Sequence, residues 1–320
     1  MRSRAFSRRH VLSLAAGAAA LGVAGAGRAT DIRWRGPVLG GEASARLRHP
    51  DPRAAERMLT RCLDEVARLE AIFSLYRPDS ELSRLNRAGR VAQASLDLRA
   101  VLGLAQHIGA VTDGRFDVTV QPLFRLFARS GPRGPGPAAF ASANDLVSYG
   151  DIDVSGGGVG FLRHGMAATL NGIAQGYIAD RVADMLRNEG YDDVLLQLGE
   201  TVALSPPGDA GWRLRTASSA GAAAFRLTNG AAATSRGAAL SFANGRDHIF
   251  DPRGGPAADR FASATVIADR AAHADALSTG LIHLPERAVP RALRRAGAAR
   301  AILVRQDGSV ARVAREGGAA

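Results

Sequence analysis

Val194-Leu195-Leu196-Gln197-Leu198-Gly199 opens the region that decides the fold. From here to about residue 267 the chain consists of short apolar runs separated by turns rich in glycine and alanine, a pattern typical of β-strands. Longer stretches with an apolar stripe at helical spacing predict helices over about 51–76, 96–111 and 170–189. Strands and helices are intermixed without a regular β-α-β alternation. We therefore expect an α+β fold, with antiparallel or mixed sheets flanked by helices.

The composition is that of a globular protein and excludes several classes of function. The chain has 320 residues, a formal net charge of +11 and no lysine, so all 41 basic residues are arginine. These arginines are spread along the chain without interleaved aromatic residues or a nucleic-acid-binding motif, so we expect no nucleic-acid partner. The single cysteine, Cys62, excludes an internal disulfide and a thiolate metal cluster. Its place on an apolar helix face predicts a buried structural thiol.

The first 29 residues have the features of an export signal. Arg8 and Arg9 precede an apolar run over residues 11–26, and small residues follow it. The adjacent arginines favour the twin-arginine route, which predicts a periplasmic protein. The run is shorter and richer in glycine than a membrane span, which needs about 20 apolar residues. We expect a signal peptide over 1–29, a domain over 30–320 with a net charge of 11 − 5 = +6, and no stable membrane span.

A candidate metal site lies in a further predicted helix, His273-Ala274-Asp275-Ala276-Leu277-Ser278-Thr279-Gly280. Asp275 and Thr279 are four residues apart, so a helix places the carboxylate and the hydroxyl on one face. Oxygen donors of this kind suit Mg²⁺ better than zinc or copper, and Mg²⁺ takes its remaining ligands from water and substrate phosphates. The alternative is an ordinary helix start whose polar residues face water. His273 is expected at the surface, without a role.

Two further stretches are candidates for binding or chemistry. Asn171-Gly172-Ile173-Ala174-Gln175-Gly176 leads into a helix whose free N–H groups form a natural seat for phosphate, and its glycines allow a ligand close to the backbone. His248 and Asp251 lie three residues apart before a Pro/Gly turn and could place a base beside a reacting phosphate. Glycines before a helix are common, however, and the second stretch is equally typical of a structural histidine and an Asp-Pro turn.

Residues 113–120 are expected to form a turn and then an alternating strand that Pro122 ends. The stretch Arg115-Phe116-Asp117 would either line a ligand site at the end of this strand or simply pack in the sheet. Tyr76 follows an apolar helix and is either a stacking surface for a flat ring or an ordinary tyrosine at the edge of the core. The chain has no Walker-type phosphate loop, no nucleophile elbow and no two-histidine zinc helix.

Taken together, stretches in the same order resemble those of the ApbE family, the FAD:protein FMN transferases. They are Ala71–Tyr76 with Ser80–Asn86, Gly114–Pro122, Asn171–Tyr177 continuing through Arg181, Ala233–Ser235, His248–Pro252 and Ala274–Thr279. The resemblance extends from about residue 38 to 313, essentially all of the chain after the signal. It implies a single catalytic domain with the ApbE-like α+β fold.

The resemblance also implies roles for individual residues. Asp275, Thr279 and the backbone carbonyl of Gly172 would bind Mg²⁺, and His248 occupies the position of the family's proposed catalytic histidine. The residues implied in FAD binding are Leu39, Tyr76, Arg115, Phe116, Asp117, Thr169, Gln175 and Phe250. Four positions depart from the residues that are usual in the family, and they bear on the FAD contacts rather than on the metal pair: Leu39, Thr169, Gln175 and Arg236.

The reaction that the resemblance implies is Mg²⁺-dependent transfer of FMN from FAD to a threonine or serine hydroxyl of a target protein, with release of AMP. The twin-arginine signal and the stretch Asn171–Gly176 look similar to those of the family branch that is associated with membrane respiratory flavoproteins. The expected partner is therefore a periplasmic or membrane-attached acceptor flavoprotein domain of a respiratory complex. Two alternatives remain open, namely a periplasmic protein that binds or delivers FAD without catalysis and a Mg²⁺-dependent FAD pyrophosphatase.

Overall fold

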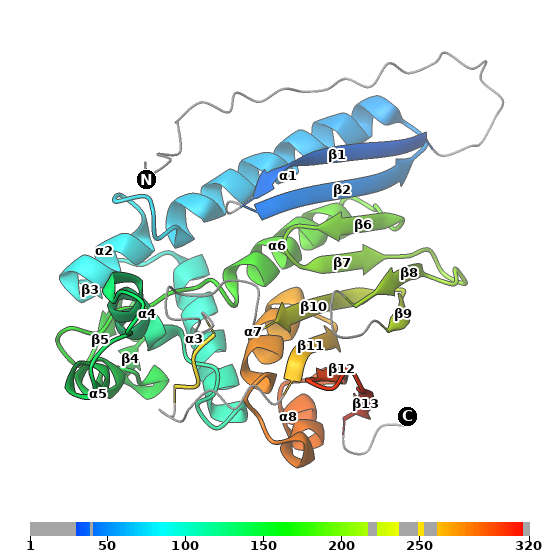
Figure 1. Cartoon of the computed structure of the whole chain (residues 1–320). Helices are drawn as coiled ribbons and strands as arrows, with labels where there is room; N and C mark the ends of the chain where they lie inside the picture. Colours follow the sequence, from blue (N-terminus) through cyan, green and yellow to red (C-terminus); the bar gives the residue numbers. More distant parts are fainter. Residues whose placement is uncertain (1–29, 39–40, 217–222, 237–248, 253–260, 316–320) are drawn as a thin grey trace.

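The computed structural model describes residues 30–38, 41–216, 223–236, 249–252 and 261–315, and it confirms the α+β architecture (Figure 1). An eight-stranded sheet runs through the molecule in the order β1-β2-β6-β7-β10-β11-β12-β13, and each neighbouring pair is antiparallel. Its strands are β1 (Thr30–Val38), β2 (Gly41–His49), β6 (Val194–Gln197), β7 (Thr201–Leu204), β10 (Gly230–Arg236), β11 (Phe261–Ala268), β12 (Ala298–Arg305) and β13 (Val310–Ala314).

Helices cover one face of this sheet and form the main core with it. They are α1 (Pro52–Phe73), α6 (Ala174–Asn188) and α7 (Ala271–Leu281), with α8 (Val289–Arg295) against β12. A second group of helices and short strands lies beside this layer, on the left of Figure 1. It contains α2 (Glu81–Ala88), β3 (Arg90–Val91), α3 (Leu96–Val111), α4 (Gln121–Arg129), α5 (Pro137–Asp145), β4 (Ile152–Asp153) and β5 (Val159–Phe161).

Three of the described helices, α1, α2 and α3, begin at a capping residue next to them in the sequence, namely Asp51, Ser80 and Ser95. The Asp51 carboxylate accepts hydrogen bonds from the N–H groups of Arg53 and Ala54 at 2.9 and 3.2 Å, and α1 starts at the following proline. Helix α1 ends at Phe73 because Ser74 has an extended backbone, a few residues before the expected boundary. The helices predicted over 96–111 and 170–189 are confirmed as α3 and α6. Cys62 is buried, as its apolar position predicts.

A close contact between α6 and α7 fixes the geometry of the site described below. A Cβ atom at Gly176 would lie 2.5 Å from the backbone oxygen of Ala271, so glycine is required for the two helices to approach this closely. The buried carboxylate of Asp180 accepts hydrogen bonds from the N–H groups of Ala271 and Ala272 at 2.7 and 2.9 Å. Asp180 on α6 therefore caps the N-terminus of α7, a role usually taken by a residue next to the helix.

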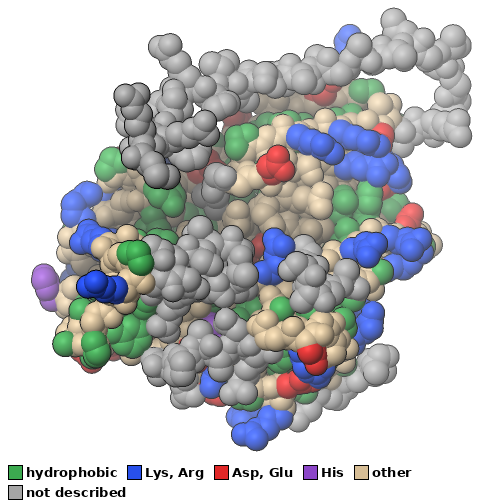
Figure 2. Space-filling model, in the orientation of Figure 1, with side chains coloured by type: hydrophobic (Ala, Val, Ile, Leu, Met, Phe, Trp, Pro, Cys, Tyr) green, Lys and Arg blue, Asp and Glu red, His purple; other side chains and the backbone are tan. Residues whose placement is uncertain are grey.

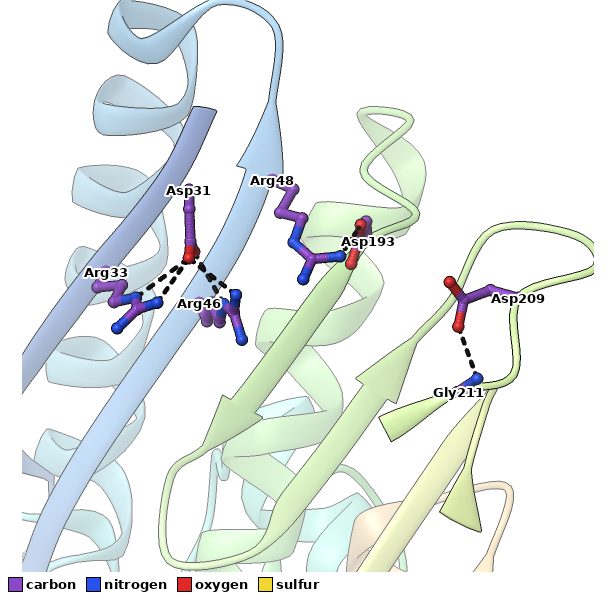
Figure 3. A network of polar contacts seen from close by, with 7 residues as sticks. All are labelled: Asp31, Arg33, Arg46, Arg48, Asp193, Asp209 and Gly211. Atoms are coloured by element: carbon purple, nitrogen blue, oxygen red, sulfur yellow. Dashed lines mark hydrogen bonds and ion pairs between the residues drawn. The ribbon is translucent and has the colours of Figure 1, made fainter. Parts of the chain in front are cut away.

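The other face of the sheet is partly covered by a hairpin of β8 (Trp212–Arg215) and β9 (Ala224–Leu227), which builds a second, smaller core. The guanidinium groups of Arg46 and Arg48 lie 5.1 and 5.5 Å from the centre of the Trp212 ring. Asp31 accepts hydrogen bonds from Arg33 and Arg46 (Figure 3), and chiefly the bond from Arg46 lowers the pKa of Asp31 to about 2. Figure 2 shows basic side chains gathered on the surface in this region.

The prediction of an alternating strand after the turn in residues 113–120 is wrong. Residues 118–120 form a 3₁₀ turn that continues into α4, and Pro122 lies in the first turn of that helix instead of ending a strand. The Asp117 carboxylate accepts hydrogen bonds from the N–H and the hydroxyl of Thr119 at 2.8 and 2.6 Å. This local bonding offers the backbone an alternative to strand pairing. Among the described helices, none is long and apolar enough to cross a membrane.

Candidate active site

The predicted site residues meet in a cavity at the N-terminus of α6. This cavity lies between α6, α7, the end of β10 and the segment that leads into α4. Nine of the twelve predicted site residues line it, namely Arg115, Phe116, Asp117, Thr169, Gly172, Gln175, Phe250, Asp275 and Thr279. They come from stretches that are far apart in the sequence, so folding is what brings them together.

Three predicted site residues are not placed in the cavity. Leu39 and His248 lie outside the described residues, so the role proposed for each stays a prediction. The Tyr76 side chain is 91% exposed beyond the end of α1 and is not among the residues that line the cavity. Its contact with FAD also stays a prediction. His273 is half-buried rather than at the open surface, and its Nδ1 atom lies 2.9 Å from the backbone oxygen of Ala296.

The Asp275 carboxylate is buried in the wall of the cavity, at the N-terminus of α6. Its side chain is buried, and one carboxylate oxygen accepts a hydrogen bond from the N–H of Gly176 at 3.1 Å. This N–H belongs to the first turn of α6, where the helix dipole favours negative charge. Burial and, to a smaller extent, the negative charge of Asp180 nevertheless raise the pKa of Asp275 to about 7. A cation beside this carboxylate would compensate for the charge that burial disfavours.

Thr279 and Gly172, the other two predicted metal ligands, lie next to each other in the cavity wall. Thr279 follows one turn later on α7, and a Cβ atom at Gly172 would lie 3.1 Å from the Thr279 hydroxyl oxygen. The backbone before α6 therefore passes directly beside the hydroxyl. A carboxylate, a hydroxyl and a backbone oxygen form a hard donor set that fits Mg²⁺. Groups of three or more His, Cys, Asp or Glu side chains able to hold a metal are absent from the described part of the chain.

Glu200 is a residue of the cavity that sequence reasoning missed. It lies in the turn between β6 and β7, lines the cavity and accepts a hydrogen bond from the N–H of Thr234. Burial and the nearby charge of Asp275 raise the pKa of the Glu200 carboxyl well above its usual range. In the sequence, Leu198-Gly199-Glu200 looks only like a turn between two strands. The signal that it faces Asp275 is the pairing of β6 with β7, which is not visible in one sequence.

Ser235 belongs to one of the stretches that resemble the family, but the sequence did not assign it a role. Its hydroxyl oxygen lies 2.8 Å from that of Ser278 and 3.0 Å from that of Thr279. The end of β10 therefore touches the same face of α7 that carries the candidate metal ligands.

Arg115 and Asp117 have different roles in the wall of the cavity. The Arg115 Nε atom donates a hydrogen bond to the backbone oxygen of His283 at 3.0 Å, which anchors a positive side chain in the wall. The Asp117 carboxylate is buried and accepts hydrogen bonds from Thr119 and from the N–H of Tyr149. Because protein donors occupy both of its oxygens, Asp117 chiefly shapes the turn that presents Arg115 and Phe116. Burial raises its pKa.

The remaining predicted contacts form the other walls. The Gln175 side chain packs against Gly199, where a Cβ atom would overlap it and where the backbone has a φ of 92° that also favours glycine. Phe250 is buried, and its ring centre lies 5.2 Å from that of Phe127 on α4. The Thr169 hydroxyl accepts a hydrogen bond from the N–H of Asn171 at 3.3 Å and thereby supports the turn before α6.

Comparison with known proteins shows the family of the chain. A model of the ApbE family matches residues 39–303, and the chain therefore belongs to the ApbE family. The FAD:protein FMN transferase of Salmonella typhimurium is 28% identical over 294 residues, which cover 85% of this chain and 81% of the relative. The enzyme of the same name from Haemophilus influenzae is 30% identical over 242 residues, which cover 68% of this chain and 70% of the relative. The chain is therefore a transferase by its family and its curated relatives.

Solved structures show the same fold. The flavin transferase ApbE from Vibrio cholerae superposes with a TM-score of 0.75 at 23% identity, over 90% of this chain and 98% of that one. The ApbE protein from Thermotoga maritima gives a TM-score of 0.78 at 24% identity, over 89% and 97% of the two chains. The predicted α+β fold class is confirmed by these likenesses.

Proposed function

We propose that this chain transfers FMN from FAD to a serine or threonine hydroxyl of a target protein and releases AMP, and that it requires Mg²⁺. The names of its curated relatives support the transfer of FMN from FAD to protein. The observation that carries the proposal is the buried Asp275 carboxylate at the N-terminus of α6, beside the Thr279 hydroxyl and the Gly172 backbone. This arrangement suits a divalent cation and a pyrophosphate at the same place.

The residues of the cavity divide the work of such a transfer. The positive end of the α6 dipole and the Arg115 guanidinium bind and orient the phosphates of FAD. Asp275, Thr279 and Gly172 would hold the Mg²⁺, which supplies positive charge against the charge that develops on the pyrophosphate. Phe116 and Phe250 provide apolar walls that exclude water from the cavity and from the flavin.

The chemical balance of the proposed step is simple. The acceptor's hydroxyl oxygen forms a bond to the phosphorus on the FMN side, and the bond from that phosphorus to the bridging oxygen breaks. AMP leaves with the bridging oxygen. The hydroxyl proton needs an acceptor, for which His248 is the residue we propose, on the resemblance of its sequence position alone.

We also propose the cellular setting from the sequence. The twin-arginine pattern at Arg8 and Arg9 supports export to the periplasm, with residues 1–29 as the signal and 30–320 as the mature domain. The acceptor would be a periplasmic or membrane-attached flavoprotein domain of a respiratory complex.

The experiment that tests this function uses residues 30–320 with FAD, Mg²⁺ and an acceptor domain that contains a reactive threonine. The expected products are an acceptor heavier by one FMN minus one water, found by mass spectrometry, and an equal amount of AMP. Tight FAD binding without either product across several acceptors would instead indicate a binding or delivery protein. FMN and AMP formed without an acceptor would indicate a pyrophosphatase.

A further inference from the structure

Three hydroxyl groups form a connected cluster at the candidate metal site. The Ser235 hydroxyl oxygen lies 2.8 Å from that of Ser278 and 3.0 Å from that of Thr279. The Ser278 hydroxyl also donates a hydrogen bond to the backbone oxygen of Asp275 at 2.9 Å. Ser278 is fully buried, and Ser235 and Thr279 are half-buried. The cluster therefore joins the end of β10 to both of the α7 residues that we assign to the ion.

The directions of these hydrogen bonds follow from the number of protons available. A backbone oxygen can only accept, so the Ser278 hydroxyl donates its one proton to the backbone oxygen of Asp275. Ser235 must then donate to Ser278, and its own oxygen is left to accept from Thr279. In this order the Thr279 proton points toward Ser235 on β10, and both lone pairs of the Thr279 oxygen remain available to a ligand.

The reverse order of donation leads to the same conclusion for Thr279. In that order Ser278 donates to Ser235, Ser235 donates to Thr279, and Thr279 donates to the Asp275 backbone oxygen at 3.3 Å. This arrangement replaces the 2.9 Å bond to the backbone oxygen with the 3.3 Å bond, so the first order is favoured. In both orders the Thr279 proton is engaged within the protein, and a lone pair faces outward.

The structure assigns Ser235 as a positioning residue that fixes the Thr279 hydroxyl for a divalent cation, and this inference rests on the ion of the proposed function. The sheet holds Ser235 in place, because β10 pairs with β11 and Ser235 lies opposite Ala264. Ala231 and Ala233, which precede Ser235 on the same side of the strand, belong to the main core beneath the helices. The strand therefore directs Ser235 toward α7. Partners that orient a metal ligand typically affect metal affinity by about 10- to 100-fold.

A neighbouring hydroxyl pair provides a matched control. Thr234 and Thr265 lie opposite each other on β10 and β11, and their hydroxyl oxygens are 2.8 Å apart. The substitution Thr265→Val removes one hydroxyl from this pair, at a buried position that does not line the cavity. It therefore reports the effect of losing a hydroxyl contact beside β10 that does not touch Thr279.

The test measures ion binding directly, without turnover. Mn²⁺ replaces Mg²⁺, and its binding to residues 30–320 in the presence of FAD is followed by the loss of the electron paramagnetic resonance signal of free Mn²⁺. We expect Ser235→Ala to weaken Mn²⁺ binding by about tenfold or more. Ser235→Thr, which keeps a hydroxyl, should bind Mn²⁺ like the native chain, and so should Thr265→Val. Circular dichroism and thermal unfolding show that each variant is folded.

The steady-state rates give a second readout. Because Ser235 would act on ion binding, Ser235→Ala should raise the Mg²⁺ concentration for half-maximal rate and lower the rate at saturating Mg²⁺ much less. If Ser235→Ala binds Mn²⁺ as tightly as the native chain while Thr279→Val binds it weakly, the role of Ser235 is overturned. That result leaves the proposed function intact. A native chain that binds no Mn²⁺ with FAD present contradicts the ion of the proposed function, and the role of Ser235 falls with it.

Discussion

The Asp275 carboxylate accepts a hydrogen bond from the N–H of Gly176 at 3.1 Å, and this bond joins the middle of α7 to the first turn of α6. The same two helices are held together at their other contact by Asp180, which caps α7 from α6. Two buried carboxylates therefore hold the N-terminus of α6 beside the helix that carries the proposed metal ligands.

The first prediction concerns the pH dependence of stability without Mg²⁺. The pKa of Asp275 rises from 3.8 to about 7 on folding, so between these values the folded chain holds a proton that the unfolded chain has released. The contribution of Asp275 to stability must therefore fall as the pH rises from about 4 to 7, by up to roughly 4 kcal/mol. Asp275→Asn should make this slope smaller in urea unfolding measured at several pH values, and Glu200, whose pKa is raised as well, should keep part of it. The exposed Asp64→Asn on α1 is the control, and an unchanged slope in Asp275→Asn would contradict the assignment.

The second prediction is that Mg²⁺ and the proton compete at Asp275. Because the carboxyl is largely protonated below its pKa of about 7, Mg²⁺ with FAD should raise the unfolding temperature more at pH 8 than at pH 6. Differential scanning calorimetry at both pH values measures this difference. The Asp275→Asn variant should show little Mg²⁺ effect at either pH. An equal effect of Mg²⁺ at both pH values would mean that the ion binds elsewhere.

The third prediction uses two glycines that both lie in helices. Gly176→Ala places a methyl group 2.5 Å from the backbone oxygen of Ala271 and should cost about 1–3 kcal/mol of unfolding free energy, because α6 and α7 must separate. Gly103→Ala on α3 meets no atom within 4 Å and should stabilise the chain by about 0.5–1 kcal/mol through its helix propensity. Urea unfolding of the two variants compares them directly. Equal effects would show that the helix contact is looser than described.

The fourth prediction concerns the cap of α7. Asp180→Ala removes the acceptor for the N–H groups of Ala271 and Ala272 and should cost about 1–2 kcal/mol, as the loss of a helix cap does. Because α7 carries Asp275 and Thr279, the variant should also bind Mn²⁺ more weakly. Glu56→Ala, on the exposed side of α1, is the control for urea unfolding and for Mn²⁺ binding. Full stability in Asp180→Ala would show that α7 does not depend on this cap.

Local signals in the sequence predict the long helices well, and they place the two proposed metal ligands on one helix face. Asp51 starts α1 where capping chemistry places it, and the four-residue spacing of Asp275 and Thr279 puts both on one face of α7. The same local reasoning fails over residues 113–120, because the Asp117 side chain bonds the backbone two residues later and replaces a strand with a turn. Alternating hydrophobicity does not reveal that side-chain bond.

Long-range pairing explains what the sequence could not show. Glu200 and Ser235 enter the site because β6, β7 and β10 lie next to one another and bring a turn and a strand end to α7. The order of strands in an antiparallel sheet is not encoded in any single stretch. The cap that Asp180 gives to α7 is hidden for the same reason, since the two ends of the bond are 91 residues apart.

The central claim is that Asp275 holds the ion proposed for flavin transfer. It is tested most directly by a Mg²⁺ titration of the native chain and of Asp275→Asn, in which mass spectrometry quantifies the acceptor–FMN adduct. We predict that the native chain forms adduct and AMP in equal amounts as Mg²⁺ is added. The Asp275→Asn variant should remain folded and should lose at least about 100-fold in rate at every Mg²⁺ concentration, because a metal ligand is missing. Full turnover of Asp275→Asn at the native Mg²⁺ requirement would contradict the assignment of Asp275 and of the site built around it.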